Sequence, residues 1–147
     1  MTTFETGIEI DRSPEEVFDV MSDLRAERSW NPAVETIEKI TDGPVGVGTR
    51  YRAKWKRSPE VIVECTRYDR PNGWTNINGG SLEIESVFTL VTTPSGTRLT
   101  NQFTVRPHGL TTLFFPIIVR TMRRQFRTNM TELKRVIEGA STTAPQQ

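Results

Sequence analysis

The chain has 147 residues, of which 35% are hydrophobic, and its 19 basic and 18 acidic side chains give a net charge of +1. This balance excludes the overall basic charge that is typical of nucleic-acid-binding domains, so we expect no nucleic-acid partner. The length favours a single domain, and because the sequence has no apolar run of about 18 residues, we expect no integral-membrane segment.

The chain begins with a predicted strand, followed by two short helices. Apolar and acidic residues alternate between Phe4 and Asp11, as in a half-buried strand. Ser13 can cap the helix that follows, Pro14 suits its first position, and Glu16 completes a capping box. The helical region is expected to end before Pro32, because the residue before a proline resists the helical conformation.

A second strand and a glycine-rich turn come next. Residues 34–40 predict the strand, and Gly43, Gly46 and Gly48 form the turn that follows it. Of these glycines, we expect Gly46 and Gly48 to take backbone conformations that a side chain would resist.

The next two strands form a predicted hairpin whose register follows from charge and hydropathy. A three-residue loop at 57–59 would place Trp55 opposite Val61 and Tyr51 opposite Cys65 on the apolar face. The same register pairs opposite charges on the other face, so both faces favour it.

The last two of the predicted seven strands are joined by a two-residue turn at 94–95. This turn sets Phe88 opposite Asn101 and Ser86 opposite Phe103. Ser86 and Asn101 would then point into the concave side of the sheet, where a polar group without a partner costs about 1–3 kcal/mol.

A long helix at about 113–138 is predicted to end the fold. Its apolar stripe consists of Phe115, Ile118, Val119, Met122, Phe126, Leu133, Val136 and Ile137. Asn129 lies near the middle of this stripe and Gln125 at its edge, a placement that solvation alone does not explain. We therefore expect residues 1–138 to form one domain and residues 139–147, which have no apolar periodicity, to form a flexible tail.

The cysteine content and the N-terminus indicate a compartment. Cys65 is the only cysteine, which excludes an intramolecular disulfide and a zinc site of several cysteines. A single thiol is typical of a reducing environment. The N-terminal residues lack a basic segment followed by an apolar one, so they predict no secretion signal. Together these features predict a cytoplasmic protein.

Four segments carry a resemblance to a known family: Ser13 to Phe18, Trp30 to Pro32, Gly43 to Thr49, and Tyr68 to Pro71. With the predicted order of elements, they make the chain from about Phe4 to Ile137 resemble the START-like helix-grip superfamily. This superfamily is also called the SRPBCC group and includes birch-pollen-allergen-like proteins. The chain is most similar to the subgroup named polyketide cyclase/dehydrase and lipid transport.

The resemblance implies an α+β helix-grip fold, in which a curved, seven-stranded antiparallel sheet wraps around a long C-terminal helix. Two short helices would follow the first strand. Members of the family bind lipids, hormones, polyketides or other apolar molecules between sheet and helix, and some close rings or dehydrate a bound substrate. The matching motifs are structural, so they transfer no catalytic residue, and we expect no metal or cofactor.

Three functions fit these observations. The first is binding of a small, largely apolar molecule that is lipid-, polyketide- or hormone-like, by a monomer or a homodimer. The second is an enzyme of the cyclase or dehydratase type, a lyase or isomerase that acts mainly by positioning such a molecule. The third is a regulatory or interaction domain whose cavity is filled.

The candidate ligand-binding residues are the polar and apolar side chains that are expected to face the interior. They are Tyr51, Trp55, Ser86, Phe88, Asn101, Phe103, Met122, Gln125, Phe126 and Asn129. Two other residues could carry chemistry. His108, the only histidine, could act as an acid or base, but its predicted loop favours an exposed position without a catalytic role. Cys65 could be a nucleophile, but its place on an inner row favours a small buried hydrophobe.

Overall fold

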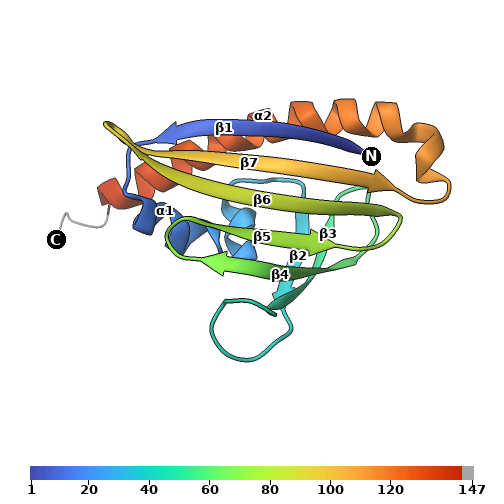
Figure 1. Ribbon diagram of the computed structural model, residues 1–147, viewed down its shortest axis with the longest axis horizontal. Helices are drawn as coiled ribbons and strands as arrows, with labels where there is room; N and C mark the ends of the chain where they lie inside the picture. The colour runs from blue at the N-terminus through green and yellow to red at the C-terminus, as the bar shows by residue number, and fades with distance from the viewer. Residues whose placement is uncertain (144–147) are drawn as a thin grey trace.

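The computed structural model describes residues 1–143, which form one seven-stranded sheet, two α-helices and a short 3-10 helix (Figure 1). The elements follow the chain as β1 (Thr2–Ile10), α1 (Pro14–Met21), η1 (Leu24–Ser29), β2 (Val34–Lys39), β3 (Arg50–Trp55), β4 (Val61–Asp69), β5 (Gly73–Asn78), β6 (Leu82–Thr93), β7 (Gly96–Pro107) and α2 (Thr111–Thr143).

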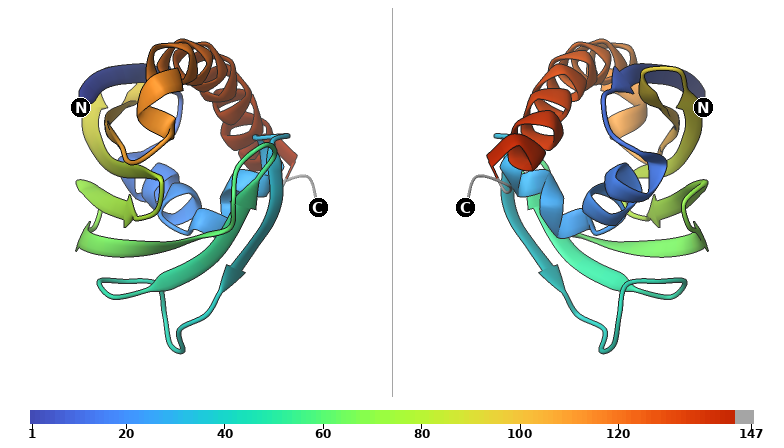
Figure 2. Two further views of the ribbon diagram at one scale, coloured as in Figure 1. Left: turned by 90° about the vertical axis from the view of Figure 1, so that its right-hand side faces the viewer. Right: turned by 90° about the vertical axis from the view of Figure 1, so that its left-hand side faces the viewer.

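The sheet is antiparallel, and its strands lie in the order β1-β7-β6-β5-β4-β3-β2. Seen end-on, the sheet curves into an arc, α2 crosses the open side of that arc, and α1 and η1 lie within it (Figure 2). α2 packs mainly on β1, and η1 packs on β2. This arrangement is the helix-grip fold, so the predicted fold class is confirmed.

The first short helix begins where the sequence predicts its cap, and the second begins at a cap that the sequence analysis did not name. Ser13 has an extended backbone, and its hydroxyl accepts a hydrogen bond from the backbone N–H of Glu16 at 3.3 Å. Asp23 caps η1 in the same way, because its carboxylate accepts from the backbone N–H of Arg25 at 3.0 Å. Each side chain satisfies an N–H that has no partner inside its helix. Both helices end before Pro32, as predicted.

The C-terminal helix is longer than predicted. α2 begins at Thr111 and includes Pro116, whose ring removes one backbone donor near the start of the helix. The helix continues past Glu138 to Thr143. Residues 144–147, the last part of the predicted tail, lie outside the described residues, so the tail stays a prediction. Within residues 1–143, neither α-helix combines the length and the apolarity that a membrane crossing requires.

The register of the β6–β7 hairpin is the predicted one. Phe88 lies opposite Asn101 and Ser86 lies opposite Phe103. The tight turn leaves only one register, because the last paired residues are Thr93 and Gly96. The side chains on the inner rows of both strands are therefore those that the sequence predicts.

The predicted register of the β3–β4 hairpin is wrong by two residues. Tyr51 lies opposite Val63 and Ala53 lies opposite Val61, and the connecting loop spans 56–60. Arg57 takes a left-handed conformation in this loop, with φ of +64°. A shift of two residues keeps the same side chains on the inner face, so alternation alone cannot detect it.

The glycine-rich turn after β2 follows the prediction in part. Gly43 and Gly48 have φ of +84° and +88°, a region that side chains resist. The prediction is confirmed for Gly48. It is wrong for Gly46, whose φ lies outside this region and whose N–H is held by the Thr49 hydroxyl at 2.9 Å.

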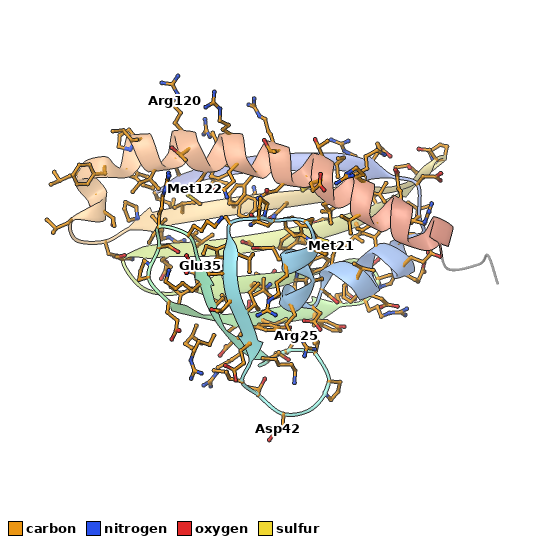
Figure 3. The ribbon with its side chains drawn as sticks, turned by 180° about the vertical axis from the view of Figure 1, so that it is seen from behind. Met21, Arg25, Glu35, Asp42, Arg120 and Met122 are labelled. Carbon is orange, nitrogen blue, oxygen red and sulfur yellow. The ribbon has the colours of Figure 1, made fainter. Side chains whose placement is uncertain are left out.

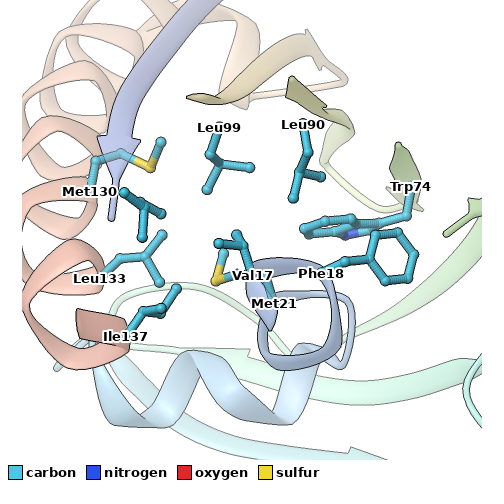
Figure 4. Packing of buried hydrophobic residues seen from close by; sticks show 10 residues of the cluster. Val17, Phe18, Met21, Trp74, Leu90, Leu99, Met130, Leu133 and Ile137 are labelled. Carbon is cyan, nitrogen blue, oxygen red and sulfur yellow. The ribbon is translucent and has the colours of Figure 1, made fainter. Parts of the chain in front are cut away.

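The interior has a closed end, where α1, the sheet and the last turns of α2 meet (Figure 4). Its buried side chains are Ile10, Val17, Phe18, Met21, Trp74, Leu90, Leu99, Met130, Leu133 and Ile137. The rings of Phe18 and Trp74 meet edge to face, with centroids 5.3 Å apart. These residues form the main core of the domain.

Two smaller clusters occupy the rest of the interior. The open end consists of buried Phe4, Phe103 and Val105 with partly exposed Leu82, Ile84, Phe115, Met122 and Phe126. The η1 cluster consists of buried Ile37, Tyr51, Ala53 and Val63 with partly exposed Leu24, Val34, Trp55 and Val61. In both clusters, several apolar side chains keep accessible surface, as Ile8, Trp30, Tyr68 and Phe88 do at the margin of the closed end.

Candidate functional site

A polar pair interrupts the inner face of the sheet between the closed and open ends. Asn101 of β7 lies opposite Thr6 of β1, and Asn101 is only 3% exposed. The Asn101 Oδ1 and the Thr6 Oγ1 are buried and have no hydrogen-bond partner within residues 1–143. Such an atom costs about 1–3 kcal/mol, so this pair favours a molecule that supplies the partner.

The long helix brings Asn129 to the same level. Phe126 stacks on Phe103 with ring centroids 4.1 Å apart, and Leu133 packs in the same cluster as Leu99. Asn129 lies between Phe126 and Leu133 on α2, so it faces the part of β7 that holds the polar pair. Asn129 is 4% exposed, and its Nδ2 has no partner in the described part of the chain. The helix therefore presents a donor without a partner, Asn129 Nδ2, and the sheet presents an acceptor without a partner, Asn101 Oδ1.

A second polar position lies further around the sheet. Asn76 of β5 lies opposite Ser86 of β6. Asn76 is buried, and its Oδ1 lacks a partner among the described residues, whereas Ser86 keeps some accessible surface. Sequence reasoning placed Ser86 on the inner row but missed Asn76, although it sits on the same face of β5 as the buried Trp74. The period-2 pattern of that strand could have found it.

Aromatic rings line the walls between these polar positions. Phe103 and Phe126 stack almost parallel, with 9° between their planes. Phe88 stacks on Trp74 with centroids 4.4 Å apart. Phe88 and Phe126 nevertheless keep accessible surface. Of the predicted aromatic residues on these walls, Phe88 and Phe126 thus have ring surface that their stacking partners do not cover, whereas Phe103 is buried.

The remaining predicted residues of α2 lie on two sides of this wall. Met122 faces the sheet, whereas Arg120 points away from it (Figure 3). Met122 packs against the open end and is partly exposed. Gln125 is also partly exposed, which matches its predicted place at the edge of the apolar stripe.

The two predicted residues of β3 lie in the η1 cluster, apart from the asparagine set. Tyr51 is buried, and burial raises the pKa of its phenol to about 12. The hydroxyl lies near the backbone of Leu24 without a well-formed hydrogen bond. The Trp55 indole donates from Nε1 to the carboxyl group of Glu27. The ten predicted residues therefore divide between two regions of the interior.

Glu27 is a site residue that sequence reasoning missed. Its Oε2 accepts hydrogen bonds from Trp55 Nε1 and from Asn31 Nδ2, the second at 3.1 Å. Protein atoms surround the carboxyl group, and this burial raises its pKa to about 7, although both hydrogen bonds oppose the shift. A carboxyl group of this kind changes its protonation near neutral pH.

A weak signal for Glu27 exists in the sequence. Glu27 follows Leu24 by three residues, which places both on one side of a 3-10 helix, whereas Asn31 lies beyond the end of η1 at Ser29. Trp55, however, is 28 residues away. No local pattern connects it to η1, so the pairing becomes visible only in the structure.

The two residues that could have carried simple catalysis do not favour it. Cys65 is buried, its thiol donates to the Arg67 carbonyl at 3.2 Å, and burial raises its pKa, which opposes a nucleophilic thiolate. His108 is exposed in the loop before α2. Among the described residues, no group of three or more His, Cys, Asp or Glu side chains could hold a metal ion.

Two grooves run along the free edge of β1, where it meets α2. The larger has a volume of about 370 Å³ and is lined by Glu5, Thr6, Gly7, Ile8, Arg127, Met130 and Thr131. The smaller, of about 190 Å³, is lined by Phe4, Glu5, Thr6, Arg123 and Arg127. Because charged side chains line both grooves, neither matches the apolar cavity that the sequence predicts.

A curved sheet, a long helix across it and an interior of aromatic and amide side chains define a helix-grip domain. Residues 1–138 match the model of the family described as polyketide cyclase / dehydrase and lipid transport. The chain belongs to this family. No curated protein matches it.

Solved structures share the fold at low sequence identity. The protein TTHA0849 from Thermus thermophilus is 19% identical with a TM-score of 0.79, over 95% of this chain and 99% of that one. A START superfamily protein from Mycobacterium smegmatis is 16% identical with a TM-score of 0.77, over 94% and 98%. Ara h 8.0201 is 16% identical with a TM-score of 0.65, over 90% and 97%. At such identities, the likeness establishes the fold alone.

Proposed function

We propose that the protein binds a small, largely apolar molecule between the sheet and α2, and that Asn76, Asn101 and Asn129 orient its polar groups. The observation that carries this proposal is the set of buried amide atoms on facing walls that lack a partner within residues 1–143. A molecule with a polar group at their level would satisfy them, while its apolar part would contact Phe88, Phe103, Met122 and Phe126.

Two further observations support this function. Side chains on the inner rows of β6 and α2 keep accessible surface, as expected where a guest and not the protein completes the packing. The family description also names polyketide chemistry and lipid transport, both of which concern largely apolar molecules.

The first test is a search for the molecule itself. Protein purified from its own host should carry a small molecule that native mass spectrometry detects as a mass added to the chain. The purified protein, freed of that molecule, should also bind a dansyl-labelled alkyl chain saturably, with one probe per chain. A protein that carries nothing and binds no probe would support an interaction domain with a filled interior instead.

Asn129→Leu tests the polar wall. Replacing a buried, unsatisfied amide by an apolar side chain should leave stability unchanged or raise it by about 1–3 kcal/mol, and should change the affinity for the dansyl probe several-fold. The matched control is Thr128→Leu, which adds the same side chain at an exposed position of α2. A loss of several kcal/mol with unchanged probe binding would instead place Asn129 in a structural network.

A further inference from the structure

We propose that Glu27 anchors the head group of the bound molecule, and that this head group donates hydrogen bonds, with a protonated amine favoured most. The inference rests on the proposed function, because it names the class of molecule that the interior takes. The ligand would be an apolar body that carries one basic or hydroxyl-bearing end.

The first observation is that one carboxyl oxygen of Glu27 is open. Both hydrogen bonds from Trp55 and Asn31 reach Oε2. Oε1 receives no hydrogen bond from the described residues. It is nevertheless not one of the side-chain oxygen and nitrogen atoms that lack both accessible surface and a hydrogen-bond partner. It therefore keeps accessible surface, although protein surrounds the carboxyl group. An acceptor that is deep but accessible is suited to a donor from a second molecule.

The second observation is that the carboxyl group is held in place. Asn31 is buried, and its Oδ1 accepts from the backbone N–H of Ala33 at 3.0 Å, which fixes the Nδ2 that reaches Glu27. The backbone N–H of Asn31 also donates to the backbone carbonyl of Glu27 at 2.9 Å. A fixed acceptor loses little conformational entropy on binding, which favours affinity.

The third observation concerns charge. Glu27 takes part in none of the ion pairs of the described residues. The groups that hydrogen-bond to it, Trp55 and Asn31, are neutral. A buried carboxylate without a cation is costly, and its raised pKa reports that cost. A bound ammonium group would supply the opposite charge, whereas an acidic head group would be repelled.

The surroundings suit a molecule with one polar end. η1 lies on the concave side of the sheet (Figure 2) and packs on β2. Leu24, Val34, Trp55 and Val61 form the partly exposed apolar rim of the η1 cluster. They would contact the apolar body of the molecule while its head reaches Oε1.

The test uses three dansyl-labelled alkyl chains of equal length that end in an ammonium, a methyl or a carboxylate group. At pH 8, the wild-type protein should bind the ammonium probe about tenfold or more tightly than the methyl probe, because a charge-assisted hydrogen bond is stronger than a neutral one. The carboxylate probe should bind most weakly. Glu27→Gln should remove the preference for ammonium. Dansyl fluorescence titrations measure all of these affinities.

The matched control is Glu35→Gln, on the exposed outer side of β2, where the carboxylate pairs with Lys54 at 2.7 Å. It removes the same charge and should leave the preference intact. Circular dichroism confirms that both variants are folded. As a second readout in the unaltered protein, the ammonium probe should shift the emission of Trp55, compared with a Trp55→Phe variant.

The outcomes separate the two proposals. If no probe binds the wild-type protein, the proposed function fails. If all probes bind with similar affinity, or if Glu27→Gln keeps the preference for ammonium, binding stands and the role of Glu27 is wrong. A preference lost equally in Glu35→Gln would mean that overall charge, and not the Glu27 site, selects the probe.

Discussion

The closed end and the open end of the interior differ in how deeply their apolar side chains are buried. At the closed end, Phe18 and Leu133 have no exposed surface, and the other buried side chains of the cluster are at most 8% exposed. Partly exposed apolar side chains, Phe88 and Tyr68 among them, lie only at its margin. At the open end, Phe115, Met122 and Phe126 face inward and still keep accessible surface. The comparison indicates that the closed end buries more apolar surface than the open end and therefore contributes more to stability.

The long helix shows the same division. Near the closed end, Lys134 donates to the Glu9 carbonyl at 2.7 Å and to the carboxylate of Glu138 at 2.8 Å, which fixes α2 to β1. In the first turns of the helix, Leu113, Phe114 and other large apolar side chains point into solvent. The first turns of α2 therefore leave more apolar surface in solvent than its last turns do, although Phe126 stacks on Phe4 and Phe103 a little further along.

The largest expected effect comes from removing a ring at the closed end. Phe18→Ala deletes a fully buried ring that contacts both Trp74 and Tyr68, and should lower the free energy of unfolding by about 3–5 kcal/mol. Phe114→Ala, at a position that is 60% exposed, is the matched control and should change it by about 0.5 kcal/mol or less. Urea denaturation measures both. Equal losses would mean that the two ends do not differ in stability.

The next effect depends on pH and involves the η1 cluster. The folded pKa of Glu27 is about 7, above its ordinary value of 4.5, so the folded state holds this proton more tightly than the unfolded chain does. The contribution of Glu27 to stability is therefore most favourable below about pH 4.5 and is lost as pH rises through 7. At about 1.4 kcal/mol per pKa unit, the shift from 4.5 to about 7 limits the loss to about 3–4 kcal/mol.

Glu27→Gln should remove this dependence, because glutamine does not titrate and can still accept from the Trp55 indole. The variant should match the wild-type protein near pH 4 and exceed its stability at pH 8. Other groups, including Asp23 and Tyr51, titrate in both proteins and cancel from the difference. Urea titrations at several pH values measure it, with Glu35→Gln as the control. A stability difference that stays constant from pH 5 to 8 would contradict the raised pKa.

The last comparison, which includes the smallest expected effect, is between two methionines of α2. Met130 is buried at the closed end, whereas Met122 is partly exposed at the open end. Met130→Ala should cost about 2–4 kcal/mol of stability, and Met122→Ala about 1 kcal/mol. Met122→Ala should in turn change the affinity for the dansyl alkyl probe more than Met130→Ala does. Thermal melts and probe titrations on both variants decide the matter, and the reverse order would reject the assignment of the two ends.

The fold was predictable where one local signal determines one geometry. The cap at Ser13 and the two-residue turn at 94–95 each allow a single arrangement, and both are confirmed. The β3–β4 register was not predictable, because Arg57 in the connecting loop takes a left-handed backbone conformation that no local sequence signal indicates. A shift of two residues keeps every side chain on its face, so hydropathy cannot correct the error.

The residues of the candidate site on β7 and α2 were predictable, because both elements are long enough to show a regular apolar period. Asn101 and Asn129 stood out as polar residues on apolar faces, and both are buried without a side-chain partner for one amide atom within residues 1–143. Glu27 was missed because η1 has only six residues, too few for a helical period. Its partner Trp55 comes from a distant strand, and such contacts depend on the tertiary fold.

The short edge strand β2 has a consequence for aggregation. A sheet edge with free backbone groups can recruit strands from other molecules, and exposed apolar side chains nearby increase that risk. β2 is an edge of this sheet, and a register shift between Val34 and Thr36 interrupts its pairing. Glu35 and Glu38 also place negative charge along it. The protein can therefore expose apolar residues on α2 without offering this edge as a template for fibrils.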